Sequence, residues 1–301
     1  MNEMRNATIG YMTPRQGIRL RWGVWKTTIE SHRGTVLLLN GRGEYVEKYD
    51  ETAADLNERG FDVYSFDWRG QGFSTRMLPN RQKGFVETYA DYLGDLDLFI
   101  KTIMMPNAHA PFYLLAHSMG AHVGLRYLHE HPGLFKRAVL TAPLIDIAMS
   151  PILKNALRVY TRWAVKCGFG ENYAPGTGNN KPQRFENNKL TSDRGRFERV
   201  RRQLLEMPGL ALGGVTHQWL LATFRSIDRL SAKGFIENME TPTLMVAAQN
   251  DRIVSIEAQK AMQKRLPQCQ LVILESAMHE ILVEADEIRN RFWKIFDDFL
   301  K

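Results

Sequence analysis

Six short apolar runs with few polar interruptions strongly constrain how this chain can fold. They occupy residues 35–40, 61–67, 111–117, 137–143, 242–249 and 269–275. Runs of this kind are typical of strands buried on both faces, as in a parallel sheet covered by helices. Residues 17–25 instead alternate apolar and polar side chains, which predicts an antiparallel strand with one solvent-facing side.

Helical periodicity fills much of the chain between these runs. Apolar residues recur at spacings of three and four from Tyr89 to Ile103 and from Ile288 to Phe299. Alternating strands and helices predict an α/β fold with a mostly parallel central sheet flanked by helices. Because the alternation breaks once, we expect residues 1–143 and 239–301 to form the core domain and residues 144–238 an inserted, mainly helical cap. A partly irregular second domain is the alternative.

Length and composition fit a large globular protein. The 301 residues are 44% hydrophobic, which is enough to bury a sizeable core. Cys167 and Cys269 stand alone, without a CxxC pair or a Cys/His cluster at metal-ligand spacing, so we predict no disulfide framework, no metal site and no cofactor. The first residues lack the apolar segment of a signal peptide and no run of 18 apolar residues occurs, so a cytoplasmic location is expected.

The positive charge of the chain is concentrated in one segment. The formal net charge is +7, and residues 144–238 hold 15 Lys and Arg against 8 Asp and Glu, whereas the remainder is balanced. Such a run is most often a solvated surface. The chain contains no basic motif interleaved with aromatic residues of the kind found in RNA-binding modules, so we expect no nucleic-acid partner.

The sequence LLAHSMGAHVG, at residues 114–124, places Ser118 between an apolar run and a helical pattern. This is the context of a nucleophile elbow, in which small residues such as Ala116 and Gly120 let strand and helix approach closely. The backbone N–H of Met119 would then be an oxyanion donor. A small-x-Ser-x-Gly pattern alone is weak support, because it arises by chance in roughly one chain in five of this length.

A serine nucleophile needs a base, and the base needs a group that orients it. Asp251 follows the run at 242–249 and His279 follows the run at 269–275, in the chain order Ser, acid, His that is expected for this architecture. Taken singly, Asp251 could be a turn residue and His279 a loop histidine. The three residue types at three successive expected positions favour a catalytic triad, and structural roles are expected for the other seven histidines.

A second oxyanion donor is expected from the sequence LLLNGRGEY, which follows the first apolar run. Gly41 and Gly43 permit a sharp turn that would direct the backbone N–H of Arg42 toward the same oxygen as Met119. A plain glycine turn explains this loop equally well. A phosphate-binding loop does not, because neither GxxxxGK[ST] nor GxGxxG occurs in the chain.

Five motifs together resemble the lysophospholipase and monoacylglycerol-lipase branch of the α/β-hydrolase serine hydrolases: NGRGEYVEKY, FDWRGQGFST, LLAHSMGAHVG, AQNDRIV and AMHEILVE. The resemblance spans nearly the whole chain and implies Ser118 as nucleophile, Asp251 as acid and His279 as base. It also implies that the backbone amides of Arg42 and Met119 form the oxyanion hole.

Two residues depart from the usual pattern of this family. Asn40 stands where the family usually has His, and Ala116 where it usually has Gly. The first departure bears on how the oxyanion loop is supported, whereas the second is a small change that packing should tolerate. Residues 186–199, ENNKLTSDRGRFER, resemble bacterial lysophospholipase-like members more than the mammalian lipase.

We therefore expect two-step hydrolysis of an acyl ester, with a lysophospholipid or monoacylglycerol as substrate. Apolar cap residues, which include Leu153, Leu157, Tyr160 and Trp163, could line an acyl channel. The basic cap could contact an anionic lipid surface transiently. A short-chain esterase, a related-fold aminopeptidase and a non-catalytic ligand-binding protein are the alternatives. An aminopeptidase would be expected to carry acidic residues in the cap, where this chain is basic. The sequence itself selects no acyl length, head group or oligomeric state.

Overall fold

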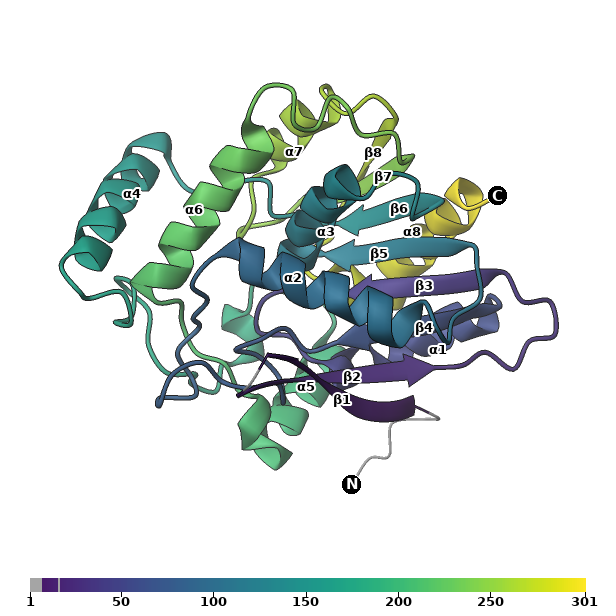
Figure 1. The fold of residues 1–301 in the computed structure, drawn as a ribbon, viewed down its shortest axis with the longest axis horizontal. Helices are drawn as coiled ribbons and strands as arrows, with labels where there is room; N and C mark the ends of the chain where they lie inside the picture. The colour runs from purple at the N-terminus through teal and green to yellow at the C-terminus, as the bar shows by residue number, and fades with distance from the viewer. Residues whose placement is uncertain (1–6, 16) are drawn as a thin grey trace.

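The computed structural model describes residues 7–15 and 17–301 (Figure 1). The strands of the described residues form one sheet in the order β1-β2-β4-β3-β5-β6-β7-β8. Their bounds are β1 Ala7–Arg15, β2 Ile18–Trp25, β3 Gly34–Leu39, β4 Phe61–Phe66, β5 Phe112–His117, β6 Arg137–Thr141, β7 Thr243–Ala248 and β8 Cys269–Leu274. Each of the six apolar runs forms one of the strands β3 to β8, which pair in parallel, so the prediction of a mostly parallel sheet is confirmed.

The antiparallel strands lie at one edge of the sheet. β2 pairs antiparallel with β4 and with β1, as its alternating sequence predicts. β1 was not predicted from the sequence, because Gly10, Thr13 and Pro14 interrupt its apolar residues and leave no continuous run. Pairing with β2 supplies the backbone hydrogen bonds of β1, which local propensity alone would not predict.

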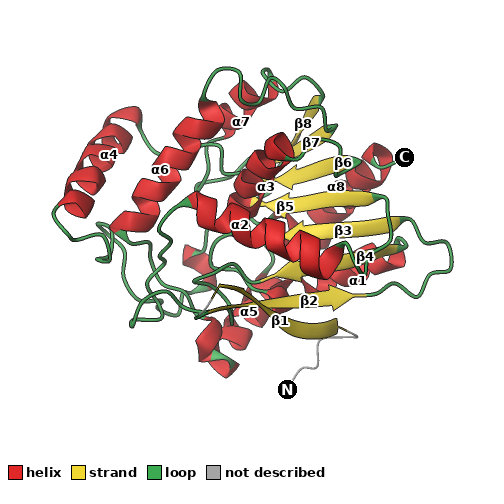
Figure 2. Ribbon diagram, in the orientation of Figure 1, coloured by secondary structure: helices red, strands yellow, loops and turns green. Residues whose placement is uncertain are grey.

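Helices cover both faces of the sheet. Figure 2 shows α2 (Tyr89–Phe99) and α3 (Ser118–Glu130) in front of the strands, and α1 (Asp50–Glu58) and α8 (Asp286–Phe299) behind them. α2 begins with a capping box between Thr88 and Asp91. α7 (Ile256–Gln263) connects β7 to β8. This arrangement is an α/β-hydrolase fold, as predicted.

Three helices lie between β6 and β7: α4 (Pro151–Lys166), α5 (Arg194–Glu206) and α6 (His217–Ser231). α4 lies at the outside of this region and α6 between α4 and the core helices (Figure 1). Trp219 of α6 is buried and its indole N–H donates to the Tyr92 hydroxyl of α2 over 3.2 Å. This part of the chain is helical and irregular, as predicted, and its division from the core at residues 144 and 238 stays a prediction.

The apolar residues of α4 that were expected to line an acyl channel do not share one buried face. Thr161 and Ala164 are buried and Leu157 packs against a small apolar cluster with α6, whereas Tyr160 and Trp163 are 46% and 56% exposed. These residues therefore do not line an acyl channel together, because most of the large side chains of α4 face solvent. Every helix of the described residues is too short or too polar to span a bilayer.

Candidate active site

The predicted site residues follow four of the parallel strands. Arg42 follows β3, Ser118 and Met119 follow β5 at the start of α3, Asp251 follows β7 and His279 follows β8. Because the carboxyl ends of parallel strands meet at one edge of the sheet, residues far apart in sequence gather there.

The turn at Ser118 is strained. Ser118 has φ of 50°, a left-handed conformation that residues other than glycine rarely adopt. A Cβ atom at Gly120 would lie 2.5 Å from the carbonyl oxygen of Asn40 and 2.6 Å from that of Leu39. Glycine therefore lets α3 pack against the end of β3, and Ser118 starts α3, where unpaired N–H groups favour negative charge.

The three predicted side chains form a continuous hydrogen-bonded line. His279 Nε2 lies 3.0 Å from Ser118 Oγ, and His279 Nδ1 lies 2.7 Å from Asp251 Oδ2. The other carboxylate oxygen of Asp251 accepts the backbone N–H groups of Ile253 at 2.8 Å and Val254 at 3.0 Å. The structure thus brings together all three residues that the sequence indicated.

The negative charge of Asp251 favours the tautomer of His279 that carries its proton on Nδ1. Burial alone would raise the pKa of Asp251, but its hydrogen bond to His279 and those to two backbone amides lower that pKa below its ordinary value. An ionised Asp251 accepts a hydrogen bond from the Nδ1–H group of His279, which leaves Nε2 unprotonated and able to accept the hydroxyl proton of Ser118.

The loop after β3, which carries the predicted oxyanion donor Arg42, is held in place through the backbone amides on either side of that residue. The N–H of Gly41 donates to the Glu44 carboxylate, and that of Gly43 donates to Gln71 Oε1 over 2.5 Å. Between them, the N–H of Arg42 donates to no described residue, and neither does the N–H of Met119. The two predicted oxyanion donors are therefore not consumed by contacts within the described part of the protein.

Asn40 is integrated into the end of the sheet, although it departs from the family pattern. It is fully buried, and its side-chain amide donates to the Phe66 carbonyl over 3.1 Å. Its own carbonyl oxygen accepts the indole N–H of Trp68 at 2.9 Å. Asn40 thus ties the start of the oxyanion loop to the end of β4.

A buried ion cluster beside the site was not anticipated from the sequence. Lys48 Nζ lies 2.8 Å from Glu44 Oε1 and 2.6 Å from Glu280 Oε1. Burial would raise the pKa of Glu44, yet Lys48 outweighs it and lowers that pKa to about 2. The i, i+4 spacing of Glu44 and Lys48 was a usable signal, whereas the contact with Glu280 depends on the tertiary fold.

Two neighbouring histidines are buried and uncharged. Burial lowers the pKa values of His117 and His122 to about 4. His117 Nδ1 contacts Thr141, and His122 Nε2 lies 2.6 Å from the Ser226 hydroxyl of α6. Their hydrogen bonds and burial fit the structural roles expected for them.

One group of potential metal ligands occurs at the opposite end of the sheet. His32 Nε2 and His109 Nδ1 lie 3.3 Å and 3.6 Å from Asp62 Oδ2. The ammonium of Lys26 lies 2.9 Å from the same oxygen and compensates its charge. These residues are far apart in the sequence and form no motif. Because Lys26 already compensates the charge of Asp62, we assign no metal to the group.

The chain resembles known proteins over nearly its whole length. Residues 30–286 match the family described as "Serine aminopeptidase, S33" (Hydrolase_4). It is 30% identical to a "Probable lysophospholipase L2" of Haemophilus influenzae over 96% of this chain and 91% of that protein. It is 32% identical to "Lysophospholipase L2" of Escherichia coli K12, over 87% of this chain and 78% of that protein.

A solved structure shares the fold. A soluble variant of monoglyceride lipase from Saccharomyces cerevisiae superposes with a TM-score of 0.77 at 20% identity, covering 98% of this chain and 95% of that chain. The strand order, the sequence matches and this likeness agree with one another. The protein therefore belongs to the Hydrolase_4 family of α/β-hydrolases, within its lysophospholipase-like and monoacylglycerol-lipase-like members, and is an ester hydrolase.

Proposed function

We propose that this protein hydrolyses lysophospholipids or monoacylglycerols with a Ser118–His279–Asp251 triad and releases a fatty acid. The observation that carries the proposal is the hydrogen-bonded line from Ser118 Oγ through His279 to Asp251, with distances of 3.0 Å and 2.7 Å. The names of the bacterial relatives, both lysophospholipases L2, support a lysophospholipid as the substrate class.

The chemistry runs in two steps. His279 Nε2 takes the hydroxyl proton as Ser118 Oγ attacks the acyl carbonyl, and the backbone N–H groups of Arg42 and Met119 stabilise the oxyanion. The C–O bond to the alcohol breaks, and the alcohol leaves with the proton from His279. Water then attacks the acyl-enzyme and gives a proton to His279, and Asp251 stabilises the imidazolium. The bond between the acyl carbon and Ser118 Oγ breaks, His279 returns the proton to Ser118 Oγ, and the acid leaves.

The exposed apolar side chains of α4 are an argument for contact with a lipid surface. α4 exposes Ile152 (85%) and Val159 (71%), and Trp163 is more than half exposed. A hollow of about 640 Å³ on this helix is lined by Asn155, Ala156, Val159, Tyr160 and Trp163, and none of these residues belongs to the triad. Arg162 and Lys166 are exposed on the same helix, so an apolar face with cationic neighbours is presented to solvent, as in helices that lie on anionic membranes.

Side-by-side rates test the substrate class. The purified protein and the Ser118→Ala variant are assayed with lysophosphatidylcholine, monoacylglycerol, a short soluble ester and an aminoacyl amide. We expect the two lipids to give the highest kcat/KM values and Ser118→Ala to lose at least about 10³-fold on each. A preference for the aminoacyl amide would support the aminopeptidase alternative that the family description suggests, and a preference for the short ester would support a small-ester esterase.

A further inference from the structure

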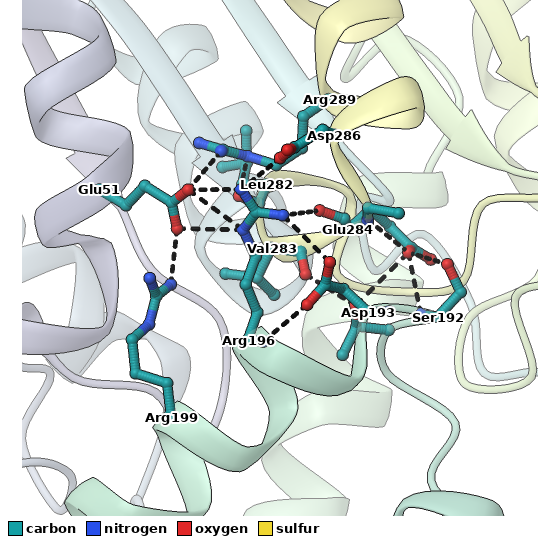
Figure 3. A network of polar contacts seen from close by, with 12 residues as sticks. Glu51, Ser192, Asp193, Arg196, Arg199, Leu282, Val283, Glu284, Asp286 and Arg289 are labelled. Carbon is teal, nitrogen blue, oxygen red and sulfur yellow. Dashed lines mark hydrogen bonds and ion pairs between the residues drawn. The ribbon is translucent and has the colours of Figure 1, made fainter.

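Glu284 is a fully buried carboxylate close to the catalytic histidine in the sequence. Figure 3 shows its side chain directed toward Ser192 of the cap segment. Glu284 Oε1 accepts the backbone N–H of Met278 at 2.6 Å, and Met278 directly precedes His279. The carboxylate therefore fixes the backbone from which the imidazole projects.

The second oxygen of the same carboxylate binds the cap. Glu284 Oε2 accepts the backbone N–H of Ser192 at 2.9 Å and its hydroxyl at 2.5 Å. It also accepts the N–H of Ala285 at 3.1 Å. One buried group thus joins the loop of the predicted base to a segment that lies about 90 residues earlier in the chain.

Two further hydrogen bonds hold the same pair of segments together. The Glu280 N–H donates to the carbonyl of Leu190 over 2.7 Å, and the Thr191 hydroxyl donates to that of Val283 over 2.7 Å. We call residues 190–192 the clamp segment. Its contacts fall on Glu280, Val283 and Glu284, which follow His279 in the chain, so the backbone beside His279 is braced by the region between β6 and β7 and not only by its own strand.

The clamp segment is anchored through the start of α5. Arg196 donates to the carbonyl of Glu284 over 2.9 Å and to Glu51 of α1 over 2.5 Å (Figure 3). Arg289 of α8 donates to the same Glu51 oxygen over 2.6 Å and to the carbonyl of Leu282 over 3.0 Å. Burial would raise the pKa of Glu51, but its bonds to arginines, that of Arg196 foremost, lower it to about 2.

We propose that Glu284 and the clamp segment position the imidazole of His279, so that the region between β6 and β7 sets the geometry of the catalytic base. This inference rests on the proposed triad. Glu284 is a positioning residue, since it contacts the backbone beside His279 and not the reacting atoms. Detachment of the clamp segment would loosen the base without changing Ser118 or Asp251.

The chemistry at Glu284 requires a carboxylate. Both oxygens accept backbone N–H groups, that of Met278 on one side and those of Ser192 and Ala285 on the other. An amide has one oxygen and one NH₂ group, so in either orientation of a Gln side chain one NH₂ faces a backbone donor. Glu284→Gln keeps the shape of the side chain but loses the hydrogen bonds on one side of it, because an NH₂ group cannot accept a hydrogen bond from a backbone N–H.

The matched control is Asp62→Asn at the opposite end of the sheet. Asp62 is also a buried carboxylate, and it accepts a backbone N–H from Thr27 at 3.0 Å and the ammonium of Lys26 at 2.9 Å. Each variant loses one buried negative charge and some of the hydrogen bonds that the carboxylate accepts. Only Glu284→Gln is expected to affect the base, so a comparison of the two separates positioning from general destabilisation.

The experiment measures kcat and KM on a short soluble ester, the pH profile of kcat/KM and the melting temperature for the wild type and both variants. We expect kcat of Glu284→Gln to fall about 10- to 100-fold with KM changed less than about threefold. We also expect the acid limb of its kcat/KM profile to move to lower pH, because a loosened imidazole is held less firmly against the Asp251 carboxylate. Asp62→Asn should melt lower but keep kcat and the acid limb of the wild type.

Ser192→Ala provides a second variant that removes one contact of the clamp segment and keeps its backbone amide. We expect a smaller fall in kcat, about two- to tenfold, in the same direction, and this variant decides the matter where Glu284→Gln does not fold. Wild-type kcat and acid limb in a folded Glu284→Gln, or in Ser192→Ala where that is the folded variant, would overturn the proposal. Full activity of Ser118→Ala would instead overturn the proposed triad, so the two failures are distinguishable.

Discussion

At the residue scale, Gly120 is a position beside the predicted site where an added methyl group would clash with the backbone. In most helices an alanine is more stable than a glycine by about 1 kcal/mol, because glycine loses more backbone freedom on folding. At residue 120 the added methyl group would meet two backbone carbonyl oxygens, those of Asn40 and Leu39. These atoms belong to the end of β3 and the start of the oxyanion loop, so relief of the clash requires movement of the site.

Gly120→Ala and Gly94→Ala form a matched pair. Gly94 is exposed on α2, and a Cβ atom there meets nothing within 4 Å. We expect Gly94→Ala to raise the free energy of unfolding by about 0.5–1 kcal/mol with unchanged activity. We expect Gly120→Ala to lower it by about 1–3 kcal/mol and to reduce kcat. Urea unfolding and ester hydrolysis of both variants check this, and equal effects at the two positions would contradict the packing argument.

At the element scale, α4 is the helix that we propose contacts lipid. Its exposed apolar side chains are unusual for a helix in water, because large apolar residues gathered on one exposed face commonly mark an interaction surface. Val159 and Trp163 lie on that face, and Leu157 packs inward against the cluster that includes Leu220 and Phe224 of α6.

We expect the double variant Val159→Ser, Trp163→Ser to bind anionic phospholipid vesicles at least about fivefold more weakly than the wild type, because less apolar area is buried at the membrane. Its melting temperature and its rate on a short soluble ester should stay those of the wild type. Vesicle co-sedimentation at two salt concentrations is the measurement. Unchanged binding of the double variant would remove α4 from the contact with lipid.

At the scale of the whole molecule, buried neutral histidines make folding sensitive to acid. Burial lowers the pKa of His122 to about 4 from an ordinary value near 6.5. The unfolded chain therefore binds the proton more readily, so this stabilisation is complete above about pH 6.5 and is lost as the pH falls toward about 4. Between pH 7.5 and pH 5 one such histidine contributes a loss of about 2 kcal/mol.

The His122→Asn variant isolates this contribution from those of other titrating groups. We expect the free energy of unfolding of the wild type to fall by about 2 kcal/mol more between pH 7.5 and pH 5 than that of the variant, whatever stability the variant loses at neutral pH. Urea denaturation at the two pH values measures both differences. Parallel decreases in the two proteins would show that His122 is not the group that titrates.

Much of the molecule could be predicted from the sequence where one local signal decides the structure. The strands β3 to β8 are continuous apolar runs; Ser118 directly follows β5, and Asp251 and His279 lie a few residues after β7 and β8. β1 could not be predicted, since its hydrogen bonds come from β2. The contacts of Glu284 with the clamp segment could not be predicted either, because they join residues about 90 positions apart and leave no periodic pattern.

Covalent labelling of the nucleophile tests the central claim most directly. The protein is treated with a fluorophosphonate probe, digested, and the modified peptide is identified by mass spectrometry. We expect one adduct on Ser118, no labelling in Ser118→Ala, and labelling slowed by roughly 10³-fold or more in Asp251→Asn, in which the imidazole loses its orienting carboxylate. An adduct on another residue, or equal labelling of the wild type and Ser118→Ala, would contradict the account.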